Sequence, residues 1–174
     1  MLKELINDTD MERMLERLAF QIIEKYPAGD LCVVGIHRRG VVLAERIHSI
    51  IKRHKKIDLP LGSLDITLYR DDLSEVGNFP DVYGSNIPFD VNNRPILLVD
   101  DVIYTGRTIR AAIDAIIDYG RPAKILFMAL IDRGHRELPI QPDFVGQKIP
   151  TGKKDDIQVH VFETDGDDGV YIRS

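Results

Sequence analysis

Two adjacent carboxylates followed by a short hydroxyl-rich turn are the residues of this chain best suited to chemistry. Residues 95–108 read PILLVDDVIYTGRT, in which Asp100 and Asp101 follow an apolar run and precede a Thr-Gly-Arg-Thr turn. Carboxylates accept hydrogen bonds from vicinal hydroxyl groups, directly or through a divalent cation that prefers oxygen ligands. Backbone N–H groups in a glycine-containing turn that opens a helix favour a phosphate. Together the two features predict a site for a phosphorylated sugar.

The elements around the turn should place both features at one edge of a sheet. Residues 96–99 form a short apolar run without alternation, as expected for a central parallel strand covered on both faces. From Thr108 onward apolar residues recur at spacings of three and four, which predicts a helix that ends at Gly120, before Pro122. For a bare Asp-Asp pair, the alternative is a cap on the following turn, without a ligand.

A second cluster, of arginines, follows the first predicted buried strand. Residues 31–36 form another apolar run, and Arg38, Arg39 and Gly40 come directly after it, before a second helical pattern. Two fixed positive charges and free N–H groups at the end of a strand suit a diphosphate. A solvated turn is the alternative interpretation of an isolated pair of arginines.

Length and composition limit the fold and exclude several classes of protein. A chain with 44% hydrophobic and 29% charged residues predicts a single globular domain over residues 1–174. No apolar run reaches membrane-spanning length, the N-terminus lacks the apolar core of a signal peptide, and the single cysteine, Cys32, excludes an internal disulfide. The cytoplasm is therefore the expected compartment, and no membrane is an expected partner.

The charged residues are unevenly distributed along the chain. The net charge is −5, which argues against a surface covered with nucleic-acid contacts. Residues 37–56 nevertheless carry seven Lys or Arg against one Glu, whereas residues 155–168 carry six acidic residues and no Lys or Arg. The basic run leaves a local basic face open, and the acidic segment is interpreted as solvated surface without chemistry.

The remaining patterns predict an α/β fold with an open, mostly parallel sheet flanked by helices. An amphipathic helix starts at a capping box of Thr9 and Glu12, residues 62–69 and 157–162 alternate as strands, and residues 124–131 form a further buried strand. Strands that alternate with helices place their functional ends along one edge of such a sheet.

Three motifs carry a resemblance to a known family. The segments DITLYRDDL, VDDVIYTGRTIRAAIDAIIDYGRP and DRGHRELPIQPDFVGQKIPT make residues 17–162 similar to type I phosphoribosyltransferases, in particular to the uracil phosphoribosyltransferases that also regulate pyrimidine operons. The resemblance implies the fold of that family, with a flexible loop and a small hood. It also implies transfer of the phosphoribosyl group of phosphoribosyl diphosphate (PRPP) to uracil, which gives UMP and diphosphate, with Mg²⁺ as cofactor.

The resemblance also implies roles for individual residues of this sequence. Asp100 and Asp101 would hold the ribose hydroxyls, stabilise positive charge on the sugar ring and approach the metal through PRPP or water. Arg38 and Arg39 would take part in catalysis by holding the departing diphosphate together with Gly40, in a loop that often contains a cis peptide. The 5′-phosphate would be bound by the turn, whose residues are Tyr104, Thr105, Gly106, Arg107 and Thr108.

A flexible loop, a base site and an RNA-binding surface come from the same resemblance. The polar stretch 70–93 has no apolar periodicity and would close over PRPP, with Arg70, Asp71 and Asp72 at its base. The base would be held by an aromatic ring and backbone groups, supplied by Phe144, Val145 and Gly146. Leader mRNA would be contacted by basic side chains, for which the candidates are Arg17, Arg133, Arg136, Lys148, Lys153 and Lys154.

Two alternatives stay open within this interpretation. The acceptor could be hypoxanthine or guanine in place of uracil, since backbone readout encodes the base poorly in side chains. The protein could also be an RNA-binding transcription attenuator that senses UMP and retains only vestigial catalysis. In either case the resemblance implies a homo-oligomer, a dimer or larger.

Overall fold

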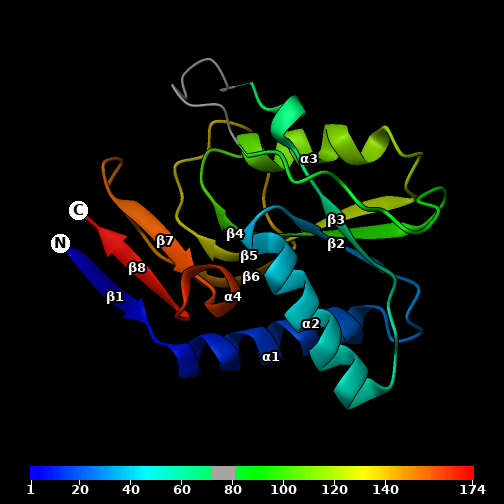
Figure 1. Cartoon of the computed structure of the whole chain (residues 1–174), viewed down its shortest axis with the longest axis horizontal. Helices are drawn as coiled ribbons and strands as arrows, with labels where there is room; N and C mark the ends of the chain where they lie inside the picture. Colours follow the sequence, from blue (N-terminus) through cyan, green and yellow to red (C-terminus); the bar gives the residue numbers. More distant parts are fainter. Residues whose placement is uncertain (72–80) are drawn as a thin grey trace.

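The computed structural model describes residues 1–71 and 81–174, and in these ranges it shows two β-sheets with helices packed around them (Figure 1). The larger sheet has five parallel strands in the order β3-β2-β4-β5-β6, and the smaller has three antiparallel strands in the order β1-β8-β7. The predicted open, mostly parallel sheet flanked by helices is therefore confirmed. In chain order the elements are β1 (Leu2–Ile6), α1 (Asp8–Lys25), β2 (Cys32–Ile36), α2 (Arg39–Lys55), β3 (Leu61–Leu64), the 3₁₀ helix η1 (Thr67–Tyr69), β4 (Pro95–Ile103), α3 (Arg107–Ile117), β5 (Lys124–Asp132), β6 (Phe144–Lys148), β7 (Asp156–His160), α4 (Phe162–Asp165) and β8 (Gly169–Arg173).

Helices cover both faces of the larger sheet, which explains the apolar runs of its central strands. Along β4, Ile96 and Leu98 belong to the core on the α3 side, whereas Leu97 and Val99 belong to the core on the side of α1 and α2. Figure 1 shows α3 on one side of this sheet and α1 with α2 on the other. None of the helices in the two described ranges is long and apolar enough to cross a membrane.

The smaller sheet lies where the two chain ends meet, and it is the hood that the resemblance implies (Figure 1). Its residues Ile157, Val159 and Val170 are buried in the same core as Met11 of α1, so the two sheets are packed around one helix. Strand β7 corresponds to the predicted strand at 157–162. Strand β1 is absent from the sequence prediction because four of its five side chains are exposed, which leaves no pattern of apolar residues.

Helix α1 begins earlier than the predicted capping box. The side chain of Asn7 accepts a hydrogen bond from the Asp10 backbone N–H at 2.8 Å, so Asn7 is the N-cap and the assignment to Thr9 is wrong. Asparagine is at least as good an N-cap as threonine, and the Thr9 hydroxyl instead donates to the carboxylate of Asp8. The apolar spacing alone could not decide between these two starts.

Strand β3 ends at Leu64, so the second half of the strand predicted at 62–69 is wrong. The Asp65 Oδ1 atom accepts hydrogen bonds from the Thr67 N–H at 2.9 Å and from the Thr67 hydroxyl at 2.6 Å, and the chain turns into η1. Leu68, which the alternation places on the same face as Leu64, is 85% exposed. The hydrogen bonds that the Asp65 side chain accepts from Thr67 thus take the place of strand pairing in residues 65–69.

Asp65 also binds the backbone of the second half of the polar stretch, at Tyr83 and Gly84. Its Oδ2 atom accepts hydrogen bonds from the N–H groups of Tyr83 at 2.6 Å and Gly84 at 2.9 Å. Burial alone would raise the pKa of Asp65, but these bonds and those from Thr67 lower it from the usual 3.8 to about 2. The ring of Tyr83 in turn stacks on the ring of His37, with 5.1 Å between centroids.

We expect Asp65→Ala to lower the free energy of unfolding by about 1–2 kcal/mol at pH 7, because four hydrogen bonds lose their acceptor. A lowered carboxyl pKa stabilises the fold above the unfolded pKa, and this stabilisation is lost as the pH falls through the folded pKa. In urea denaturation the difference between wild type and variant should therefore shrink between pH 3.8 and about pH 2. A difference that is the same at both pH values would contradict the role of the ionised carboxylate.

Candidate active site

The loop after β2 lies against the end of β4, because the two strands are parallel neighbours. This arginine loop, residues 37–40, ends with Gly40 at the start of α2. A Cβ atom on Gly40 would lie 2.4 Å from the Val99 carbonyl oxygen, so only glycine lets the helix begin so close to β4. The peptide bond between His37 and Arg38 is cis. The arginine loop and the acidic pair are thus neighbours at one edge of the sheet, as the sequence predicts.

Asp100 and Asp101 lie within β4, whose ladder with β5 continues past them. Asp100 is buried and its Oδ1 accepts the Asp101 N–H at 3.0 Å, while Asp101 Oδ1 accepts the Val102 N–H at 2.7 Å. Burial, and then the charge of Asp101, raise the pKa of Asp100 well above its usual range. Burial also raises the pKa of Asp101, although hydrogen bonds and the charge of Arg39 oppose it. Burial thus disfavours the charged form of both carboxyl groups, and a positive charge on a bound ligand beside Asp100 and Asp101 would offset this cost.

The acidic pair is not a complete metal site by itself. In the two described ranges, no three His, Cys, Asp or Glu side chains gather in a way that could hold a metal ion. Mg²⁺ takes about six oxygen ligands, of which it usually draws only one or two from protein carboxylates. A Mg²⁺ ion beside Asp100 and Asp101 would thus need oxygen atoms from a diphosphate or from water. The two carboxylates match the small number of protein ligands that Mg²⁺ usually has.

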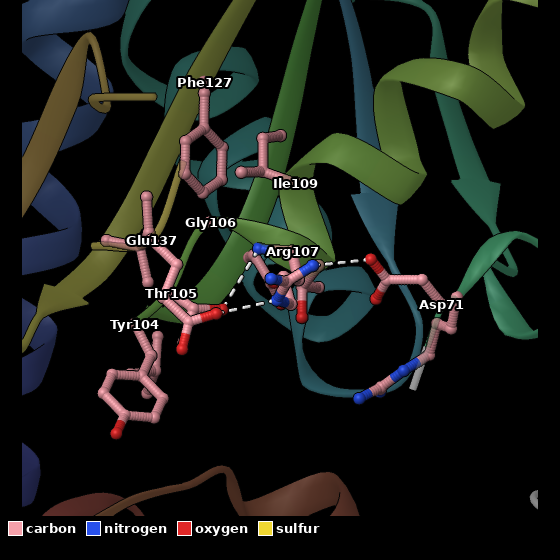
Figure 2. Close-up of a pocket in the computed structure, with 13 residues that line it drawn as sticks. Asp71, Tyr104, Thr105, Gly106, Arg107, Ile109, Phe127 and Glu137 are labelled. Carbon is pink, nitrogen blue, oxygen red and sulfur yellow. Dashed lines mark hydrogen bonds and ion pairs between the residues drawn. The ribbon is translucent and has the colours of Figure 1, made fainter. Parts of the chain in front are cut away.

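Residues 104–108, here called the phosphate loop after the ligand that the sequence predicts for them, face a pocket of about 590 Å³ (Figure 2). Gly106 is the residue before α3 and has a φ of +95°, a conformation that favours glycine. In the described part of the chain the N–H groups of Thr105 and Gly106 have no acceptor, and the first turn of α3 follows them. The pocket is lined by Arg70, Asp71, Asp100, Val102, Ile103, Tyr104, Thr105, Gly106, Arg107, Thr108, Ile109, Phe127 and Glu137.

Arg107 of the phosphate loop is held between two carboxylates (Figure 2). Its Nε donates to Glu137 at 2.8 Å and its Nη1 donates to Asp71 at 2.7 Å. The guanidinium thus ties the phosphate loop to the start of the polar stretch, a contact that the sequence does not reveal. Glu137 is a pocket residue that sequence reasoning missed, because nothing in its local pattern distinguishes it from a solvated side chain. Asp72, predicted beside Asp71, lies outside the described residues.

Arg39 contacts the acidic segment near the C-terminus, to which the sequence assigns no chemistry. Its Nε and Nη2 atoms donate to Asp165 of α4 at 3.0 and 2.6 Å. Burial alone would raise the pKa of Asp165, but the bonds from Arg39 and from the Val161 N–H hold it below its usual value. A second pocket, of about 360 Å³, is lined by Arg39, Asp101 and four residues of β7. The hood therefore forms one wall beside the acidic pair.

The residues predicted to bind the base lie on the edge strand β6, next to α1. Phe144 starts the edge strand β6 and is 8% exposed, in the core shared with α1, so a stacking role for its ring stays a prediction. Val145 is half-buried in the same strand. The Gly146 carbonyl accepts a hydrogen bond from Arg17, and a Cβ on Gly146 would lie 2.3 Å from the Met14 sulfur. Within the motif PDFVG, Phe144 and Gly146 thus pack β6 against α1.

Three of the six candidate RNA contacts are engaged within the protein. The Arg17 side chain donates to the Gly146 carbonyl of the edge strand β6. Arg133 is 7% exposed and its guanidinium lies 4.0 Å from the centroid of the Tyr104 ring. Arg136 pairs with Asp132 at 2.7 Å, and both side chains are largely buried. Arg133 is buried and Arg136 is half-buried, whereas the exposed candidates are Arg17, Lys148, Lys153 and Lys154. The RNA contacts stay a prediction.

The sequence is similar to known proteins over nearly its whole length. Residues 2–165 match the family described as phosphoribosyl transferase domain. The bifunctional protein PyrR of Caldicellulosiruptor saccharolyticus is 53% identical over 171 residues, which cover 98% of this chain and 94% of that protein. The bifunctional protein PyrR of Latilactobacillus sakei is 49% identical over 175 residues, which cover 99% of this chain and 98% of that protein.

Solved structures share the fold at much lower identity. A hypoxanthine-guanine phosphoribosyltransferase from Bacillus anthracis has a TM-score of 0.68 at 20% identity, covering 85% of this chain and 84% of that one. A hypoxanthine phosphoribosyltransferase from Trypanosoma cruzi has a TM-score of 0.69 at 17% identity, covering 85% of this chain and 81% of that one. The domain match and the full-length identities show that the chain belongs to the phosphoribosyl transferase family and, within it, to the bifunctional PyrR proteins.

Proposed function

We propose that the protein transfers the phosphoribosyl group of PRPP to uracil, giving UMP and diphosphate, with Mg²⁺ as cofactor. One observation carries the proposal: Asp100 and Asp101 lie between the phosphate loop and the arginine loop on a single sheet edge. A ribose anchored through its 5′-phosphate on the phosphate loop would direct its hydroxyl groups at the acidic pair and its diphosphate at the arginine loop.

In the proposed reaction the bond between ribose C1 and the diphosphate oxygen breaks, and a bond forms between C1 and uracil N1, which loses its proton. Positive charge develops on the sugar ring, close to Asp100 and Asp101. Because burial makes their negative charges costly in the free protein, that positive charge is stabilised strongly when it arrives. The remaining rate enhancement would come from positioning, without a covalent nucleophile.

The departing diphosphate is assigned to the side of the arginine loop. Arg38 is exposed there, Arg39 lines the 360 Å³ pocket with Asp101, and Gly40 contributes the start of α2. Fixed guanidinium groups suit phosphate oxygens. Mg²⁺, when bound, would neutralise the leaving group, and the acidic pair would approach it through PRPP or water.

The proposal is tested by diphosphate release from PRPP and Mg²⁺, with uracil, hypoxanthine and guanine as parallel acceptors. We expect release that depends on uracil, since the full-length relatives are PyrR proteins and the purine enzymes share only the fold. Release with a purine but not with uracil would reassign the acceptor. No release with any base would refute the enzymatic role.

A second candidate function is UMP-dependent binding to leader mRNA of pyrimidine genes, favoured by the PyrR relatives and by the exposed Lys148, Lys153 and Lys154. Retention of leader RNA with and without UMP, on the preparation used for turnover, would test it. Retention without turnover would mean that the site acts as a sensor. We also propose a homo-oligomer, a dimer or larger, which light scattering would detect.

A further inference from the structure

The end of β5 and the residues after it donate hydrogen bonds to three successive carbonyl groups, those of residues 103, 104 and 105, at the start of the phosphate loop. We call this segment, residues 132–138, the brace. The Arg133 N–H donates to the Ile103 carbonyl at 3.1 Å. The N–H groups of Glu137 and Leu138 both donate to the carbonyl of residue 105, at 2.8 and 3.0 Å. The backbone of the brace thus holds the carbonyls on either side of residue 104.

The carbonyl between these two is held by a side chain, that of Arg136. Its Nη1 donates to the Tyr104 carbonyl at 3.0 Å. Its Nε donates to the Ile140 carbonyl at 2.9 Å, and its Nη2 donates to Asp132 at 2.7 Å. The side chain is 14% exposed, and that of Asp132 is 7% exposed. Because the guanidinium fork is planar and rigid, these acceptors fix where its Nη1 donor lies.

The directions of these carbonyls determine where the loop's own donors point. In a planar trans peptide the C=O and the next N–H point in opposite directions. The carbonyls of Tyr104 and Thr105 point at the brace, so the N–H groups of Thr105 and Gly106 point away from it. Both N–H groups lack an acceptor in the described chain, and their residues line the 590 Å³ pocket (Figure 2).

We propose that Arg136 is a positioning residue for the phosphorylated sugar: by holding the Tyr104 carbonyl it orients the Thr105 N–H toward the bound 5′-phosphate. The inference rests on the proposed function only in naming that phosphate as the ligand. The proposal also accounts for the second arginine of the segment DRGHREL, Arg136, by a contact within the protein. The contact of Leu138 with the loop supports the same arrangement, since a Cβ on Gly106 would come within 3.3 Å of the Leu138 Cβ.

The test compares Arg136→Lys and Arg136→Gln with Arg110→Gln. Lysine keeps the charge but cannot hold the three acceptors in one plane, and glutamine removes the charge as well. Arg110 lies on α3 directly after the phosphate loop, and its guanidinium pairs with Asp114 at 3.3 Å and with Asp71 at 3.8 Å. Only its backbone N–H, which the substitution keeps, bonds a loop carbonyl, that of Gly106, so loss of the side chain controls for positive charge near the site. The readouts are KM for PRPP, kcat, and the Kd of ribose 5-phosphate from calorimetry below the unfolding temperature of each variant.

We expect both Arg136 variants to raise KM for PRPP and Kd for ribose 5-phosphate about tenfold or more, with a smaller change in kcat. Arg110→Gln should change each value less than about twofold. Unchanged KM and Kd in Arg136→Lys, or an equal rise in Arg110→Gln, would overturn the inference. If the wild type binds ribose 5-phosphate but releases no diphosphate, the proposed function fails, and the Kd values still decide the role of Arg136.

Discussion

Replacing Asp101 by asparagine is expected to lower kcat by about 100-fold to 1,000-fold and to leave thermal stability nearly unchanged. The substitution keeps the size of the side chain and removes the negative charge that would face the developing positive charge of the ribose. Stability should not suffer, because burial raises the pKa of Asp101 and the charged carboxylate therefore costs free energy in the folded protein. Asparagine removes that cost and can still accept the Val102 N–H.

The measurement is kcat at saturating PRPP, Mg²⁺ and uracil, together with the melting temperature of each protein. Asp114→Asn is the matched control, since Asp114 is an exposed carboxylate on α3 that pairs only with Arg110 in the described chain. It should retain turnover. Wild-type kcat in Asp101→Asn would refute the assigned role, and a melting point lowered by more than about 5 °C would assign the loss to folding instead.

The central strand and the phosphate loop could be predicted because their signals are local. An apolar run of four residues has few structures available other than a strand buried on both faces, and Gly106 marks the turn where α3 begins. The prediction nevertheless ended the strand before the acids. In the structure β4 continues to Ile103, paired with Asp132 of β5, because ladder hydrogen bonds come from the backbone and do not require apolar side chains.

The contacts of the hood with the arginine loop could not be predicted, because they join residues more than a hundred positions apart. The basic run and the acidic segment are each visible in the sequence, and each alone suggests a solvated surface. In the structure Arg39 pairs with Asp165, and Arg46 pairs with both Glu163 and Asp168. The complementary charges of the two segments were the signal available, but no pattern in either segment indicates which residues pair.

The basic residues of the brace show a further limit of sequence reasoning. A pattern of arginines reports charge but not whether that charge is exposed, so Arg133 and Arg136 looked like contacts for an acidic partner. In the structure the Arg136 side chain is 14% exposed and donates to the backbone carbonyls of Ile140 and Tyr104, which its sequence pattern does not show. Phe144 shows the same limit, since an aromatic residue in a strand packs in a core as readily as it stacks on a ligand, and the sequence does not distinguish the two.

Gly40→Ala is expected to lower the free energy of unfolding by about 3 kcal/mol and to reduce activity beyond that loss of stability. The new Cβ would meet the Val99 carbonyl oxygen at 2.4 Å and the Asp100 Cα at 3.1 Å, and neither backbone atom can move without shifting β4. Helix α2 would have to retreat, which widens the gap between the arginine loop and the acidic pair. Urea denaturation and kcat/KM for PRPP measure the two effects.

Gly152→Ala is the control for this substitution, because its Cβ would meet only the side chain of Asp155, at 3.1 Å, and a side chain on an exposed turn can rotate away. It should cost less than about 1 kcal/mol. Wild-type stability in Gly40→Ala would show that α2 does not begin as close to β4 as the structure places it. Reduced stability with unchanged kcat/KM would show that catalysis tolerates a wider gap, so that the distance between the arginine loop and the acidic pair does not limit the reaction.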